Sequence, residues 1–147
     1  MMLMLFENIL VPFDLSSPSN HAFKAALDIA QKYNSKITLL TCVEGDSWHH
    51  KFYDARADSE LLKKQTKAAK KFMEKLEESA NKAGVKIKLQ IIKSTSVVKD
   101  ITTFAKSRQI DLIVMGSHGR TGLDKLILGS VANGVIQRST VPVLLIK

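Results

Sequence analysis

The chain has 147 residues, of which 45% are hydrophobic and 24% charged, and its net charge is +8. This length and composition predict one globular domain over residues 1–147, which can bury a core without disulfides or structural metal ions. The single cysteine, Cys42, excludes an intramolecular disulfide, and its apolar surroundings in the sequence predict a buried side chain rather than a reactive thiol. No apolar stretch approaches the roughly 20 residues that cross a bilayer, and residues 1–6 lack the basic start of a signal peptide. We therefore expect a cytoplasmic protein with no membrane partner.

Apolar runs and amphipathic segments alternate along the chain. The apolar runs predict strands at residues 8–13, 36–43, 86–93, 111–115 and 141–146. Their nearly continuous apolar character is typical of strands that are buried on both faces. The segments between them have helical periodicity and predict helices that start near Ser17, span 58–83 and 97–107, and include Val131, Val135 and Ile136.

The predicted helices carry capping residues, and the longest has an apolar stripe. Ser17 or Ser19 can cap the first helix, and Gly84 can end the second. The stripe that the second helix is expected to bury consists of Leu61, Ala68, Phe72, Leu76, Ala80 and Ala83. Residues 44–57 before this helix fit no regular pattern and predict an irregular loop without an indicated role.

The alternation of strands and helices predicts the fold class. It indicates a single-domain α/β protein with an open five-stranded parallel sheet and helices on both faces, as in Rossmann-like folds. Much of the basic charge lies on the second helix, at Lys63, Lys64, Lys67, Lys70, Lys71 and Lys75. We interpret this as a solvated face rather than a nucleic-acid surface, because glutamates accompany the lysines and aromatic residues are not interleaved with them.

The strongest candidate site follows the fourth predicted strand. Residues 116–122 (GSHGRTG) hold three of the seven glycines, and Gly129 and Ser130 open the last helix. Glycines permit a close approach to backbone N–H groups, and a helix N-terminus attracts anions, so two such segments at one sheet edge predict a phosphate site. Two alternatives remain open at this point: the glycine segment can be only a turn, and Ser130 only an N-cap. His118 is interpreted as a solvated loop residue rather than a catalyst.

Other nucleotide and metal motifs do not match. No GxGxxG follows the first strand, which excludes a dinucleotide-binding Rossmann fingerprint, and no segment fits the P-loop pattern GxxxxGK[ST]. His49 and His50 are adjacent but lack further ligand residues nearby in the sequence, so they do not predict a metal site.

Three segments resemble the universal stress protein family over essentially the whole chain. They are NILVPFDLSSPSNHAFKAALDIA near the start, GSHGRTGLDKLILGS, and VPVLLIK at the end. The middle segment fits the family pattern G-x-x-G-(nine residues)-G-[ST] with Gly116, Gly119, Gly129 and Ser130. The resemblance implies a fold similar to adenine nucleotide alpha hydrolases, and it implies the family's ATP-binding branch.

The same resemblance implies an ATP site, with Mg²⁺ or Mn²⁺ accompanying the nucleotide. Asp14 is expected to bind the ribose, and Pro12 and Val43 to meet the adenine. The remaining residues implied for the nucleotide are Met115, Gly116, Gly119, Arg120, Gly129, Ser130 and Val131. The resemblance also implies a homodimer in which the strands at 141–146 of two copies pair.

These features predict a nucleotide-binding regulatory protein of the stress response, with no catalytic residue and at most weak ATP hydrolysis. Two alternatives remain. One is a slow ATPase that uses His118, Arg120 and Lys125; the other is a basic adaptor for RNA or protein with a vestigial nucleotide site. The sequence does not identify a protein partner, and it makes nucleic acid the less favoured one.

Overall fold

The computed structural model describes residues 6–44, 55–118 and 128–147. Strands and helices alternate through these segments, as the sequence predicts. The strands are β1 (Asn8–Pro12), β2 (Lys36–Glu44), β3 (Lys86–Ser94), β4 (Leu112–Gly116) and β5 (Val143–Ile146). The helices are α1 (Ser17–Tyr33), α2 (Ala55–Lys82), α3 (Val97–Ser107) and α4 (Ser130–Arg138).

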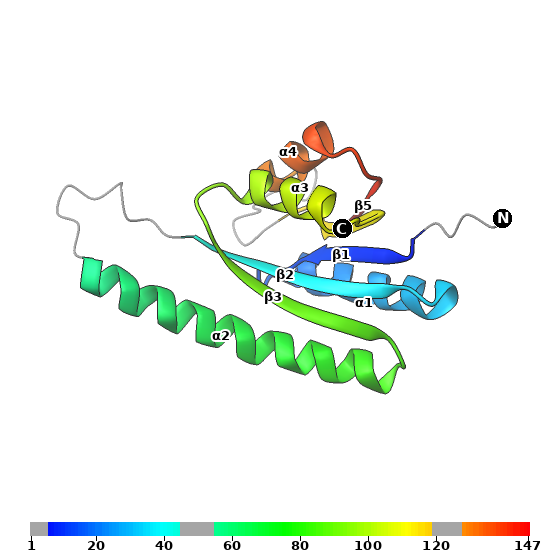
Figure 1. Cartoon of the computed structure of the whole chain (residues 1–147), viewed down its shortest axis with the longest axis horizontal. Coiled ribbons are helices and arrows are strands. Elements are labelled where there is room, and N and C mark those ends of the chain that lie inside the picture. The colour runs from blue at the N-terminus through cyan, green and yellow to red at the C-terminus, as the bar shows by residue number, and fades with distance from the viewer. Residues whose placement is uncertain (1–5, 45–54, 119–127) are drawn as a thin grey trace.

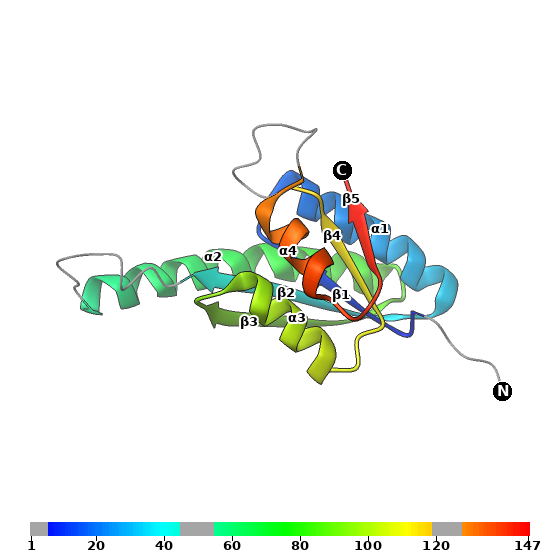
Figure 2. The same ribbon diagram turned by 90° about the horizontal axis from the view of Figure 1, so that it is seen from above.

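The strands form one parallel sheet in the order β3-β2-β1-β4-β5. Helices α1 and α2 lie on one face, and α3 and α4 lie on the other (Figure 1; Figure 2 shows the sheet from above). The fold class predicted from the sequence is therefore confirmed. The strand order reverses between β1 and β4, and ligands of open parallel sheets bind beyond the carboxyl ends of the strands at such a point.

Alternate residues of the central strand fill two separate cores. Ile9 and Val11 of β1 pack toward α1 and α2 together with Phe23. Leu10 points the other way and packs with Ile101 of α3 and the buried part of α4. This alternation within β1 reflects the period of two of an extended chain with a covered layer on each side.

The two edge strands differ from the prediction that strands are buried on both faces. The first four residues of β3 alternate between exposed and half-buried positions, with Lys86 and Lys88 exposed, and the next three are half-buried. β5 is half-buried and begins at Val143 rather than 141, with Leu144 39% exposed. The prediction is correct for β1 and β4, which have neighbours on both sides and helices on both faces, and it is wrong for the edges.

Helix α2 buries the predicted stripe only toward its carboxyl end, where Ala80 is buried and Leu76 and Ala83 pack against the core. Before that, Ala69 and Met73 are buried, whereas Leu61 and Phe72 are 55% and 51% exposed. The predicted stripe was one residue out of phase up to Phe72, which rotates the buried face by about 100°. Apolar residues stand at both phases, so the pattern alone did not distinguish them. The helix also starts at Ala55 rather than 58, while residues 45–54 of the expected loop lie outside the described residues.

The helix ends have ordinary caps, but the N-cap of α1 lies before the predicted residues. The N-cap of α1 is Ser16, whose Oγ accepts a hydrogen bond from Ser19 N at 3.2 Å, so the predicted caps Ser17 and Ser19 are wrong. Gly84 has a φ of +75° just beyond α2, as expected for a glycine that ends a helix. Among the described residues, no helix combines the length and the apolar composition needed to cross a membrane.

Candidate functional site

The carboxyl end of β1 turns sharply into α1. Pro12 ends the strand half-buried, and the side chain of Asp14 is exposed. One Asp14 carboxylate oxygen, Oδ1, accepts a hydrogen bond from Ser16 N at 3.0 Å. Leu15 between them has a φ of +69°, an uncommon conformation for a residue with a Cβ. The turn therefore holds the Asp14 carboxylate at the sheet edge and leaves Oδ2 without a donor among the described residues.

β2 continues past the end of β1 and forms a wall beside this turn. Pro12, the last residue of β1, pairs with Leu40, so Thr41 to Glu44 extend beyond it. Thr41 Oγ1 donates a hydrogen bond to the Phe13 carbonyl at 2.8 Å and fastens the turn to the wall. Val43 is buried, with 6% of its surface exposed, so its backbone rather than its side chain is the part that faces the edge.

Met115 and Gly116 end β4 next to β1. The Met115 side chain is 4% exposed and belongs to the core beneath α3 and α4, which leaves only its backbone at the edge. A Cβ built on Gly116 would lie 2.8 Å from Pro18 Cβ and 2.9 Å from the Pro18 carbonyl carbon. Glycine is therefore required at 116 by the packing of the α1 start on β4.

The start of α4 is tied to the end of β4. Gly129 N donates a hydrogen bond to the Ser117 carbonyl at 2.8 Å, and Gly129 is the N-cap with φ −62° and ψ 154°. Ser130 is the first helical residue, so the alternative that Ser130 is only an N-cap is wrong. Gly129 has no side chain to cap the helix, and no side-chain cap is present in the described residues. Among the described residues, the N–H groups of Ser130, Val131 and Ala132 have no acceptor, as expected for the first turn of an uncapped helix.

The loop between β4 and α4 is described only at its ends. The predicted residues Gly119 and Arg120, like Lys125, lie outside the described residues. His118 is half-buried rather than solvated, and its Nδ1 lies 2.8 Å from Ser117 Oγ. Its Nε2 is buried and has no partner among the described residues. The prediction of a solvated His118 is therefore wrong.

Three structural features of this edge were not predicted from the sequence. Two of them are contacts, namely the approach of Pro18 to Gly116 and the hydrogen bond from Gly129 N to the Ser117 carbonyl, and the third feature is the positive φ of Leu15. Residues far apart in the chain make the first two, and no local pattern marks them. A proline in the first turn of α1 is visible in the sequence, but its neighbour across the sheet is not.

Cys42 lies near the same end of β2, and its environment suppresses thiol chemistry. Burial, with smaller contributions from the carboxylates of Asp100 and Glu44, raises the pKa of Cys42 from 9.0 to about 12. The thiol is half-buried and packs against the core under α3. The side chain is half-buried rather than buried as predicted, and the raised pKa supports the prediction of an unreactive thiol.

The raised pKa of Cys42 predicts slow alkylation and a loss of stability in alkali. At pH 8 the thiolate fraction is about a thousandfold below that of an ordinary cysteine, so we expect iodoacetamide to react at least about a hundredfold more slowly with folded than with urea-unfolded protein. Above pH 9 the unfolded thiol ionises while the folded one stays protonated, so stability falls as the pH rises from 9 toward 12. Equal alkylation rates in the two states would contradict the burial of Cys42, and Cys42→Ala controls for other alkaline effects.

Fold and edge geometry together define an open, doubly wound α/β protein with a candidate ligand site at the reversal of its strand order. The model of the universal stress protein family matches residues 5–147, and the chain belongs to that family. Universal stress protein MJ0531 of Methanocaldococcus jannaschii is 34% identical over 149 aligned residues, which cover 97% of this chain and 83% of the relative.

Two solved structures of universal stress proteins share this fold. The universal stress protein UspA of Lactobacillus plantarum superposes with a TM-score of 0.89 at 29% identity, covering 97% of this chain and 99% of that one. A universal stress protein of Archaeoglobus fulgidus, solved in complex with dAMP, has a TM-score of 0.70 at 20% identity, with 98% of this chain and 100% of that one covered. At that identity the second likeness shows the fold alone.

Proposed function

We propose that this chain binds ATP at the carboxyl edge of the sheet and acts as a regulatory protein of the stress response. The observation that carries the proposal is the start of α4. The N–H groups of Ser130, Val131 and Ala132 have neither a backbone acceptor nor a side-chain cap within the described part of the chain, and they form a positive helix end. A phosphate group supplies the acceptors that this helix end lacks.

Each part of the edge suits one part of the nucleotide. Ser130 and Val131 would hold the terminal phosphates through their N–H groups and the Ser130 hydroxyl. Asp14 would accept hydrogen bonds from the ribose, because Oδ2 has no donor among the described residues. The backbone of Val43, which continues the wall beyond β1, would meet the adenine beside Pro12.

The glycines take unequal parts in this proposal. The N–H of Gly129 is already bonded to the Ser117 carbonyl, so Gly129 is not proposed as a donor. Its lack of a side chain would let the phosphates approach the backbone closely. Gly116 and Met115 would contribute backbone at the floor of the site. Gly119 and Arg120 remain proposals that rest on the family pattern. The dAMP complex of the Archaeoglobus fulgidus protein supports an adenine nucleotide as the ligand class.

A divalent cation would depend on the nucleotide for most of its ligands. Among the described residues, no group of three or more His, Cys, Asp or Glu side chains could hold a metal ion. Mg²⁺ commonly keeps several waters and binds phosphate oxygens with one or two carboxylates. Because Asp14 is proposed for the ribose, the ion would be held mainly by phosphate oxygens and water, and it would neutralise phosphate charge.

Regulation is favoured over turnover by the hydrogen bonds of the carboxylates near this edge. Asp14 accepts from Ser16 N, and Asp100 accepts from Ser94 Oγ at 2.5 Å. Asp14 Oδ2, which has no donor among the described residues, would be taken by the ribose, so neither carboxylate is proposed to activate water. We propose a binding protein whose nucleotide changes its surface for a partner.

We also propose that the protein is a cytoplasmic homodimer joined through β5. This strand pairs with β4 on one side and is the edge of the sheet on the other. Leu144 is 39% exposed along it, and an apolar edge strand that pairs with a second copy hides its unpaired backbone groups.

Replacing Asp14 with alanine is expected to weaken ATP binding by about 1–3 kcal/mol, since it removes hydrogen bonds from a charged acceptor. Asp14→Ala and the removal of the ribose hydroxyls should eliminate the same hydrogen bonds, so their two losses of affinity should not add. The wild-type protein should bind 2′,3′-dideoxy-ATP more weakly than ATP, whereas Asp14→Ala should bind both alike. Additive losses from the substitution and the missing hydroxyls would show that Asp14 does not contact the ribose, and Ser17→Ala on the exposed start of α1 is a matched control.

A further inference from the structure

Part of one sheet face is left uncovered by the helices. On the face that carries α3 and α4, α3 contacts β2, whose Leu40 and Cys42 join the core beneath it, and the amino-terminal halves of β2 and β3 remain open (Figure 2). Lys36 pairs with Lys86, and Thr38 pairs with Lys88, so these side chains share one face of the sheet. That face is the one toward which Leu40 points, into the core beneath α3.

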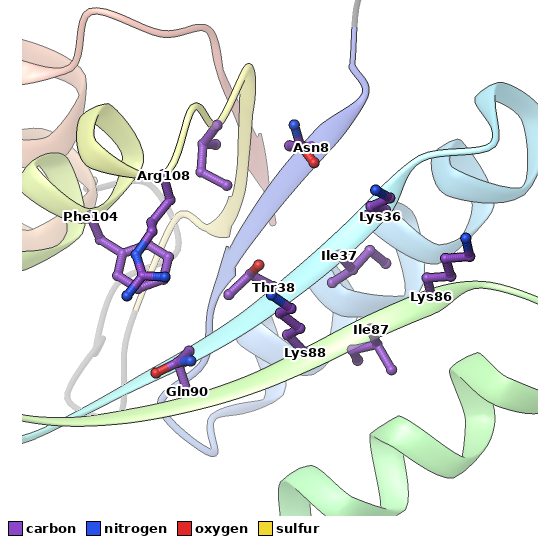
Figure 3. Close-up of a pocket in the computed structure, with 11 residues that line it drawn as sticks. Asn8, Lys36, Ile37, Thr38, Lys86, Ile87, Lys88, Gln90, Phe104 and Arg108 are labelled. Carbon is purple, nitrogen blue, oxygen red and sulfur yellow. The ribbon is translucent and has the colours of Figure 1, made fainter.

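A hollow of about 520 Å³ lies over this open area. The strands form its floor, and the last turn of α3 forms one side through Phe104, with Arg108 directly after the helix (Figure 3). The Arg108 guanidinium carbon lies 5.3 Å from the centre of the Phe104 ring, which holds the cation beside the floor. We call this feature the basic hollow.

The basic hollow concentrates positive charge without a paired carboxylate. Lys36, Lys86, Lys88 and Arg108 line it, no acidic residue does, and within the described part of the chain none of the four forms an ion pair. The nearby Asp111 carboxylate is engaged by the N–H groups of Glu7 and Asn8. Like charges directly opposite on paired strands destabilise a sheet, and a bound anion removes that repulsion.

The shape and donors of the basic hollow select a class of ligand. Its volume falls in the usual range of small-molecule sites, about 300–1,000 Å³. Lysine ammonium groups attract phosphate as point charges, and an arginine fork binds two phosphate oxygens. Single-stranded nucleic acid is disfavoured because it needs open aromatic rings for stacking, and the ring of Phe104 is covered by Arg108.

We propose that the basic hollow is a second ligand site, which binds a small molecule carrying two or more phosphate groups. Lys36 and Lys86 are the first residues of β2 and β3, so this site lies at the amino edge of the sheet. The candidate nucleotide site lies at the carboxyl edge, and both sites can be filled at once. The proposal stands on the sheet face alone and does not depend on ATP binding.

The test is a titration of ¹⁵N-labelled protein with inorganic tripolyphosphate, followed by NMR at about 150 mM salt. Saturable shifts are expected at residues 36–40, 86–90 and 104–110, apart from any shifts at 129–132. Replacing Lys36, Lys86 and Lys88 together with glutamine is expected to weaken binding at the first set at least about tenfold. The matched control is Lys63, Lys67 and Lys71 of α2 replaced by glutamine, which removes the same charge from exposed positions and should change affinity less than about twofold.

Three results overturn the proposal. The first is that tripolyphosphate does not shift the resonances of the basic hollow. The second is that the two triple variants lose affinity equally, because net charge alone would then explain the binding. The third is tighter binding of a single-stranded oligonucleotide of about 12 residues than of tripolyphosphate, with a loss confined to the hollow variant, which would make the hollow a nucleic-acid surface. Selective loss of tripolyphosphate binding in that variant supports the proposal, and thermal melts confirm that both variants fold.

Discussion

Replacing Ser130 with proline is expected to weaken ATP binding by about tenfold to a hundredfold while leaving α4 intact. Proline removes the first free N–H of the helix together with the hydroxyl, so the phosphates lose up to two hydrogen bonds. The substitution suits the local backbone, because proline is favoured at the first helical position. Gly129 before it has ψ 154°, a value that a residue preceding proline readily adopts. Titration calorimetry with ATP measures the effect.

Ser130→Ala is the matched control, because it removes the hydroxyl and keeps the N–H. Its loss of affinity should be clearly smaller than that of Ser130→Pro. Ser130 is exposed, so neither change should lower the melting temperature by more than about 2 °C. If Ser130→Pro binds ATP as tightly as the wild type and melts normally, the helix end is not the phosphate site.

Replacing Gly116 with alanine is expected to destabilise the fold by about 1–3 kcal/mol, which lowers the melting temperature by about 2–4 °C for each kcal/mol. The new Cβ would lie 2.8 Å from Pro18 Cβ and 2.9 Å from the Pro18 carbonyl carbon. Neither atom can rotate away, because the proline ring is rigid and the other atom is backbone. Relief therefore requires the start of α1 to move, and this helix start follows the turn that holds Asp14. Chemical denaturation measures the loss.

Gly134→Ala is the comparison that separates the two kinds of close contact. A Cβ at Gly134 would lie 2.8 and 3.0 Å from the two γ-carbons of Val98, so only side-chain atoms oppose it closely. Val98→Ala should therefore rescue Gly134→Ala, whereas Pro18→Ala should not rescue Gly116→Ala, because the backbone of residue 18 remains. Rescue of both, or a neutral Gly116→Ala, would contradict the packing role of Gly116.

Much of the fold was predictable because its signals are local. The apolar run of β4 has few polar interruptions, and Gly84 gives α2 a clear end. Position in the sheet is not a local property, so the exposed lysines of β3 were read as part of a buried run. The predicted buried face of α2 was wrong around Phe72 for a related reason. Phe72 and Met73 are both apolar, and only the packed sheet determines that Met73 is the buried one.

The position of the candidate site was predictable from the sequence, but the role of each of its residues was not. Glycine spacing indicated the edge beyond β4, and the family resemblance extended the assignment to Asp14 and Val43. Gly129 was expected to bind phosphate, yet its N–H is bonded to the Ser117 carbonyl. The basic hollow escaped notice because Lys36, Lys86 and Arg108 come from three segments that only the sheet and α3 bring together.

The measurement that tests the central proposal most directly is titration calorimetry with ATP, ADP and AMP, with and without Mg²⁺. If the start of α4 holds the terminal phosphates, affinity should fall stepwise from ATP to AMP, by about tenfold for each phosphate removed. ATP, ADP and AMP that bind equally well, or none that binds at all, would contradict a phosphate site at Ser130 and Val131.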